Sequence, residues 1–88
     1  MPGSMDVQLV SAEDDLYVGT AEFVSTQTVE GSIGIMPGHT PILAQLPAGE
    51  VKIVSGGTDH KFQIEGGFLT VKDNKVIILA EAAADEPA

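Results

Sequence analysis

The sequence has 88 residues, so it forms at most one domain with a thin core. Thirteen acidic residues against four lysines and no arginine give a net charge of −9, which argues against binding to nucleic acid or insertion among anionic lipids. The lack of cysteine excludes disulfides, cysteine-based zinc sites and thiol catalysis. No apolar run has the ~18 residues of a membrane helix, and the first residues lack the pattern of a signal peptide, so we expect a cytosolic protein.

Short strand signals recur along the chain, whereas ten glycines and five prolines leave few windows for a helix. This pattern predicts an all-β sandwich or barrel. The predicted strands are residues 7–10, 21–28, 33–35, 42–46, 51–54, 61–65, 68–72 and 75–80. We assign residues 1–5 to an extension or an expression remnant, 6–83 to the domain, and 84–88 to an acidic, alanine-rich tail whose composition is compatible with the start of a helix.

Four segments have specific signals for a turn, a loop or a bulge. Asp73-Asn74 separates two apolar runs and predicts a hairpin turn, and residues 55–60 are expected to form a flexible hairpin loop. Gly66-Gly67 indicates a bulge or a close backbone approach. Pro37-Gly38 favours a type II turn that holds His39 on a rigid corner. The His39 side chain there either caps a backbone carbonyl or faces a partner.

Residues 76–79, and parts of 42–46 and 68–71, are apolar at successive positions, so both faces of these strands are apolar. An isolated antiparallel sheet has polar residues on its outer side. Two interpretations remain open: these are central strands covered by loops, or a partner covers one outer surface.

No catalytic constellation is present. There is no phosphate-binding loop or nucleophile elbow, and His39 and His60 are expected in separate turns without other ligands at metal-binding spacing. Adjacent Asp14 and Asp15 point apart in a turn, which is unsuited to acid–base catalysis. We therefore predict a non-enzyme without a cofactor or a metal.

The most distinctive segment has the spacing G-x-I-G-I-x-P-G-H-x-P-I-L, formed by Gly31, Ile33, Gly34, Ile35, Pro37, Gly38, His39, Pro41, Ile42 and Leu43. It resembles the signature of the epsilon subunit of F-type ATP synthases. Four more pieces match the family in the same order: a first strand at 9–13, an aromatic-x-Gly turn at 17–21, a middle strand at 49–53, and a closing pair at 66–71 and 76–83. The resemblance covers about residues 6–83, which correspond to the family's amino-terminal domain.

The resemblance implies a flattened sandwich of two five-stranded antiparallel sheets, about ten short strands in all. Such a domain is a non-catalytic rotor part of the central stalk, which transmits rotation of the proton-driven c-ring to the gamma subunit and so, indirectly, to ATP synthesis in the α/β hexamer. It implies a peripheral location on the cytoplasmic face of the bacterial plasma membrane. The positions that match the family's gamma interface are Ser11, His39, Thr40, Pro41, Ile42 and Leu43, and those that match the ring-facing turn are Glu30, Gly31 and Ser32. Many members have an acid in that turn, where this chain has Ser32.

Longer family members continue into a helical hairpin that inhibits ATP hydrolysis and in some members binds ATP. This sequence ends at Ala88, where the first helix would begin, so the resemblance implies no hairpin, ATP binding or hairpin-type inhibition. The sequence leaves two other functions open. An extracellular sandwich for sugar binding or adhesion needs exposed aromatic residues, and only Tyr17, Phe23, Phe62 and Phe68 are available. An ATP-sensing regulator requires the helical extension.

Overall fold

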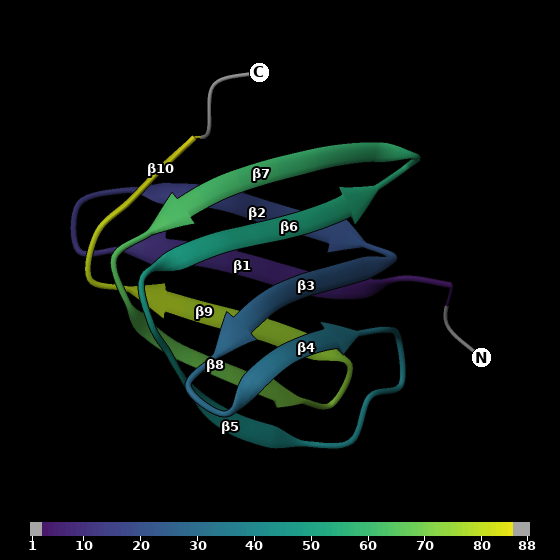
Figure 1. Ribbon diagram of the computed structural model, residues 1–88. Coiled ribbons are helices and arrows are strands. Elements are labelled where there is room, and N and C mark those ends of the chain that lie inside the picture. Colours follow the sequence, from purple (N-terminus) through teal and green to yellow (C-terminus); the bar gives the residue numbers. More distant parts are fainter. Residues whose placement is uncertain (1–2, 86–88) are drawn as a thin grey trace.

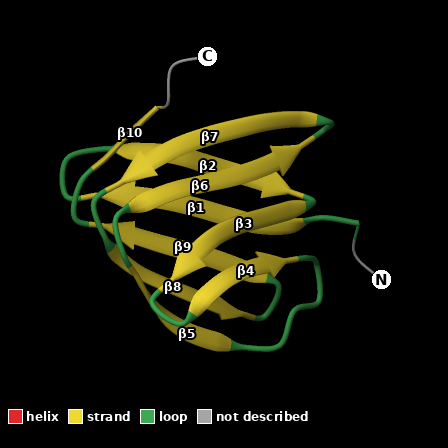
Figure 2. Cartoon of the chain, viewed as in Figure 1, coloured by secondary structure: helices red, strands yellow, loops and turns green. Residues whose placement is uncertain are grey.

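The computed structural model describes residues 3–85, and these residues form strands and turns without a helix (Figures 1 and 2). No helix in this part of the chain could therefore cross a membrane. The strands are β1 (Met5–Ser11), β2 (Asp15–Ala21), β3 (Phe23–Thr28), β4 (Gly31–Ile35), β5 (Ile42–Leu46), β6 (Gly49–Ser55), β7 (Thr58–Ile64), β8 (Gly67–Lys72), β9 (Lys75–Ala80) and β10 (Ala83–Asp85).

The strands form two five-stranded sheets that pack face to face (Figure 1). The first sheet has the order β2-β1-β9-β8-β5, and the second has the order β10-β7-β6-β3-β4. The expected sandwich of two five-stranded sheets is confirmed. One pairing departs from the antiparallel expectation, because β1 lies beside β9 and runs parallel to it. β1 therefore joins its hairpin partner β2 to the β8–β9 hairpin within one sheet.

The core lies between the sheets and is built from every second residue of the strands. In β1, for example, Met5, Val7 and Leu9 are buried while the residues between them are not. β-branched and leucine side chains fill the interior, and burial of each stabilises the fold by about 1.5–3 kcal/mol. The largest side chains that are fully buried include Leu9, Ile35, Ile53, Ile64, Leu69 and Ile78.

The hairpin turns follow the local sequence. Asp73 and Asn74 have φ angles of 52° and 60°, as a tight type I′ turn requires, so the predicted turn is confirmed. Gly56 and Gly57 also have positive φ, at 59° and 79°, and connect β6 to β7 in two residues. The expected flexible loop over 55–60 is thus mostly strand, because two glycines are sufficient to reverse the chain.

The predicted close approach at Gly66-Gly67 is confirmed. A Cβ atom on Gly67 would lie 2.0 Å from the carbonyl oxygen of Leu79 on the neighbouring strand. Gly66 has a φ angle of 122°, which side chains rarely allow. Glycine is therefore required where β8 begins against β9.

Both ends of the described chain belong to the sandwich. Met5 was assigned to the extension, but it starts β1 and is only 2% exposed. Residues 83–85 do not begin a helix; they form β10, because the edge of β7 offers unpaired backbone groups to an extended segment. Residues 17–21, where the resemblance placed a turn, belong to the edge strand β2. The rest of the predicted tail, residues 86–88, lies outside the described residues.

Candidate interaction surface

The outer side of the first sheet is apolar. We define the apolar face as six residues that point away from the core on all five strands: Val10, Val18, Leu43, Phe68, Ile77 and Leu79. Leu43 is 74% exposed, Val18 65%, Leu79 55% and Phe68 52%, while Val10 and Ile77 are half-buried. Large side chains exposed together in this way are uncommon on a monomeric protein and indicate an interaction site.

The strand register arranges the apolar face in two rows. One row across the sheet runs from Val10 to Leu79 and then to Phe68 on three neighbouring strands. The next row contains Ile77, opposite Thr70, which in turn lies opposite Leu43. Cross-strand neighbours have Cβ atoms about 4.5–5.5 Å apart, so Val10, Leu79 and Phe68 adjoin directly. Ile77 and Leu43 flank Thr70 in the next row, and Val18 is separated from Ile77 by Gln8.

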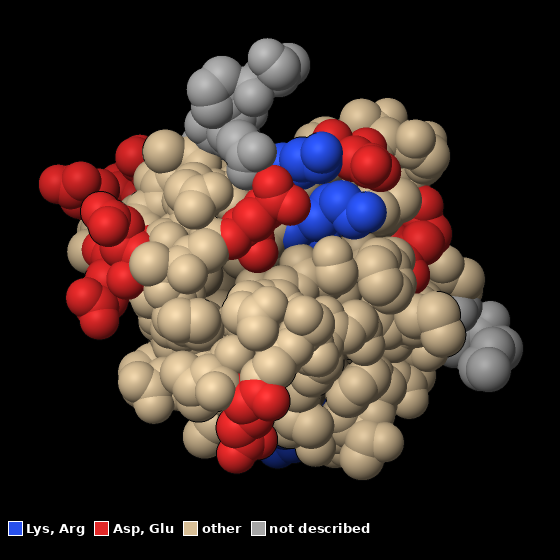
Figure 3. All heavy atoms as spheres, in the orientation of Figure 1, with Lys and Arg blue, Asp and Glu red and all other residues tan. Residues whose placement is uncertain are grey.

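The outer side of the second sheet is polar by contrast. Figure 3 shows this side, with lysines and carboxylates gathered in its upper part, in the region of β6 and β7. The register places Lys52 opposite Lys61 and Glu50 opposite Gln63 on these strands. The outer side of the first sheet is therefore apolar and that of the second is polar, and only the first is typical of a docking surface.

The corner before β5 is rigid. His39 donates its backbone N–H to the Met36 carbonyl at 3.1 Å, and Gly38 has a φ angle of 84°, which confirms the predicted type II turn over Pro37-Gly38. Nδ1 of His39 lies 2.7 Å from the Thr40 carbonyl oxygen. The ring thus caps a backbone carbonyl, which is the first of the two interpretations left open for it.

Asn74 ties this corner to the β8–β9 turn. Its side-chain Oδ1 accepts the Gly38 N–H at 3.0 Å, and its Nδ2 donates to the Ser4 carbonyl at 3.0 Å. Its backbone carbonyl also accepts the Asp6 N–H at 3.1 Å. One residue thereby connects three segments at this end of the first sheet, and the sequence indicated only its role in the turn.

The structure separates the residues that were expected to face gamma. Leu43 belongs to the apolar face, and Thr40 and Pro41 are exposed beside it on the corner. Ile42 points the other way and packs against the core, so it is not an exposed contact residue.

Ser11 lies at the end of the sheet opposite the corner, because β1 ends there while β5 begins at the corner. Its hydroxyl accepts the N–H of Asp14 at 3.2 Å and stabilises the β1–β2 turn. His39 and Ser11 are therefore not brought together.

The turn that was expected to face the ring lies at the Ser11 end, where the Val29 N–H donates to the Gln45 carbonyl at 3.0 Å. The Thr28 hydroxyl accepts the Glu30 N–H at 3.1 Å and donates to the Gly31 carbonyl at 2.8 Å. Ser32 donates its hydroxyl to the side chain of Gln27 at 3.0 Å. These bonds fix the turn while leaving the Glu30 side chain exposed.

Sequence reasoning missed part of the apolar face. It identified residues 68–71 and 76–79 as apolar on both faces, but not Val10 or Val18. The sequence did contain a signal for Val10. Residues 7, 9 and 10 are all apolar, and since successive residues of a strand point to opposite faces, residues 9 and 10 cannot both face the core.

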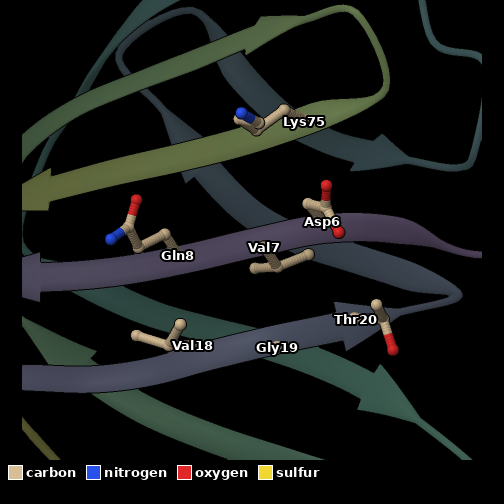
Figure 4. A pocket seen from close by; sticks show the side chains of 7 residues that line it. All are labelled: Asp6, Val7, Gln8, Val18, Gly19, Thr20 and Lys75. Atoms are coloured by element: carbon tan, nitrogen blue, oxygen red, sulfur yellow. The ribbon is translucent and has the colours of Figure 1, made fainter.

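A shallow hollow of about 320 Å³ lies on the same side of the sheet, between β1 and β2 (Figure 4). Its lining is open and mostly made by neighbouring strand residues rather than by converging polar groups, as a small-molecule site needs. It is lined by Asp6, Val7, Gln8, Val18, Gly19, Thr20 and Lys75. Within residues 3–85 there is also no group of three or more His, Asp or Glu side chains that could hold a metal ion.

A sandwich with one polar and one apolar outer sheet, and with a rigid corner beside the apolar one, defines a protein-interaction module. The sequence matches the family of the ATP synthase Delta/Epsilon chain, beta-sandwich domain, over residues 4–86, and the chain belongs to this family. The resemblance stated from the sequence is thereby confirmed.

Two relatives illustrate the range of lengths in the family. The chain is 45% identical over 83 residues to the ATP synthase epsilon chain of Hydrogenovibrio crunogenus, covering 94% of this chain but 58% of the relative. It is 40% identical over 78 residues to the ATP synthase epsilon chain of Frankia casuarinae, covering 88% of this chain and 92% of that relative.

The fold is also found in a solved assembly. A chain in the cryo-EM structure of the Euglena gracilis mitochondrial ATP synthase (OSCP/F1/c-ring in rotational state 1) is similar, with a TM-score of 0.90 and 25% identity. The match covers 97% of this chain and 55% of that chain.

Proposed function

We propose that this chain is the β-sandwich part of a non-catalytic rotor subunit in the central stalk of an F-type ATP synthase. Its role is to connect the rotating c-ring to the gamma subunit, so that proton-driven rotation reaches the α/β hexamer. The observation that carries the proposal is the apolar face, since large exposed apolar side chains gathered on one sheet mark a surface that a partner covers. The epsilon-chain relatives and the c-ring-containing assembly support it.

The gamma subunit covers the apolar face in this proposal. Leu43 lies on the edge strand β5 near the corner, and His39, Thr40 and Pro41 extend the contact along the chain. Ser11 lies at the far end of the same sheet. Ile42 packs against the core and so fixes the position of β5, which carries Leu43. An interface with an apolar centre and a polar rim is typical of permanent subunit contacts.

The c-ring contacts the turn formed by Glu30, Gly31 and Ser32. This turn is pinned by the hydrogen bonds to Thr28 and is exposed at its tip, so it can transmit force without deforming. Its polar side chains suit polar loops of a membrane ring better than lipid. The subunit is then peripheral, on the cytoplasmic face of a bacterial plasma membrane.

The test is the binding of purified gamma subunit to the Leu43→Asp variant of the 88-residue chain. Leu43 is 74% exposed, so the variant folds, and we expect its affinity for gamma to fall at least about tenfold because a charge is buried in the contact. Gln63→Asp is the matched control, since it adds the same single charge at an exposed position of β7, on the outer side of the second sheet and away from the apolar face. Equal affinity of both variants and the unchanged chain would refute the proposed docking face.

A further inference from the structure

Lys72 and Lys75 form a like-charged pair at one end of the apolar face. They lie directly opposite each other on β8 and β9, next to the connecting turn, and both are exposed. Like charges in directly opposed positions destabilise a sheet, and nothing in the turn requires them. The chain has only four lysines and no arginine, so half of its cationic side chains are placed in this pair.

The pair borders a hollow on the outer side of the sheet. The hollow measures about 260 Å³ and is lined by Thr70, Lys72, Asp73, Lys75 and Ile77. Ile77 belongs to the apolar face, so the hollow continues that face rather than standing apart from it. Lys75 also borders the hollow of Figure 4, where Asp6 is its neighbour in the register.

The charges at the two ends of the apolar face differ. At the end beside the corner, the two lysines are balanced by two carboxylates, those of Asp73 beside the hollow and of Asp6 opposite Lys75. At the other end, Glu13 and Asp14 in the β1–β2 turn and Asp15 at the start of β2 are all exposed, without a lysine among them. The lysines of the surface therefore lie at one end only, and the other end is acidic.

We propose that the Lys72–Lys75 pair binds a carboxylate side chain of the gamma subunit and so sets the orientation in which gamma docks on the apolar face. This inference rests on the proposed function. Apolar contact alone has no preferred direction, so it would allow gamma to dock in several orientations. A partner carboxylate is attracted by the two ammonium groups, whereas in the reversed orientation it would meet the acidic β1–β2 turn. The Thr70 hydroxyl, on the wall of the hollow, provides a further donor.

The chain supplies its own control for this proposal. Lys52 and Lys61 form the same kind of opposed pair on β6 and β7, on the outer side of the second sheet. Replacing either pair by glutamate changes the net charge from −9 to −13. The two double variants thus have the same overall charge and differ only in which sheet carries the change.

The experiment measures gamma binding by calorimetry for Lys72→Glu/Lys75→Glu and for Lys52→Glu/Lys61→Glu. We expect the first variant to bind at least tenfold more weakly and the second to stay within about twofold of the unchanged chain. For the unchanged chain, affinity should fall as salt rises from about 50 to about 500 mM, and Lys72→Gln/Lys75→Gln should lose most of that salt dependence. Equal weakening of both glutamate variants would overturn the proposal, because overall charge would then explain it.

The outcomes separate this inference from the proposed function. If the unchanged chain binds gamma, Leu43→Asp weakens binding and the Lys72→Glu/Lys75→Glu variant binds normally, then gamma docks on the apolar face but the lysine pair does not orient it. If the unchanged chain does not bind gamma at all, the proposed function itself fails, and the inference with it.

Discussion

Gly67→Ala is predicted to destabilise the sandwich strongly, although it adds a single methyl group. The new Cβ would lie 2.0 Å from the carbonyl oxygen of Leu79 and 2.9 Å from Cα of Ala80. Ordinary van der Waals contact begins at 3.4 Å, so the two strands must separate by roughly 1.4 Å at this point. Both obstructing atoms are backbone, so no side-chain rotation can relieve the clash.

The magnitude follows from the hydrogen bonds that such a separation breaks. Gly67 pairs with Ala80 at the start of the β8–β9 ladder, where the backbone is buried. A buried backbone group that loses its partner costs about 1–3 kcal/mol, so one broken bond that leaves both its donor and its acceptor unpaired lowers the free energy of unfolding by about 2–6 kcal/mol. In a domain of this size, each kcal/mol lowers the melting temperature by about 4–8 °C.

The assay is thermal and urea unfolding followed by circular dichroism. Gly49→Ala is the matched control, because no atom lies within 4 Å of a Cβ at that position and its backbone angle is ordinary. We expect the control to remain within about 0.5 kcal/mol of the unchanged chain. If Gly67→Ala were equally well tolerated, the close approach of β8 to β9 would not exist in solution.

Two further predictions concern the corner and the turn that holds it. Gly38→Val should lower the free energy of unfolding by about 1–2 kcal/mol, because Gly38 has a φ of 84° that a β-branched residue adopts only under strain; an unchanged melting temperature would exclude the type II turn. Asn74→Gly places at this position a residue that also tolerates a φ of 60°, but it removes both hydrogen bonds of the Asn74 side chain. The Gly38 amide loses its acceptor and should therefore exchange its hydrogen faster. Asn74→Asp retains the acceptor for that amide and should restore slow exchange, which hydrogen-exchange mass spectrometry or NMR can measure.

Most of the fold could be predicted because the inner strands have clear local signals. Residues 61–65 alternate between polar and apolar side chains, and residues 75–80 form a short run rich in β-branched and apolar residues. The corresponding strands β7 and β9 each have a neighbouring strand on both sides. The missed strands, β2 and β10, are both at sheet edges. In β2 only Ala21 is fully buried, so its seven residues carry little of the alternation from which a strand is recognised.

The interaction surface was harder to predict, because it depends on which residues the sheet brings side by side. The contiguous segment 39–43 mixes corner residues, the core residue Ile42 and the exposed Leu43, and sequence proximity alone could not separate them. Val10 and Phe68 are far apart in the sequence, and they are joined on one face only through the pairing of both with β9. Such pairing is a property of the topology and not of any local pattern.

The parallel contact between β1 and β9 has a consequence for how the protein is made. The first strand leaves the ribosome well before its central neighbour in the sheet, because the seven strands β2 to β8 are synthesised between them. Until then β1 has only β2 beside it, and a two-stranded hairpin is marginally stable in water. The apolar side of this hairpin is therefore exposed to aggregation until β9 has been made, and folding should be slow because the β1–β9 contact joins segments that are far apart in the sequence.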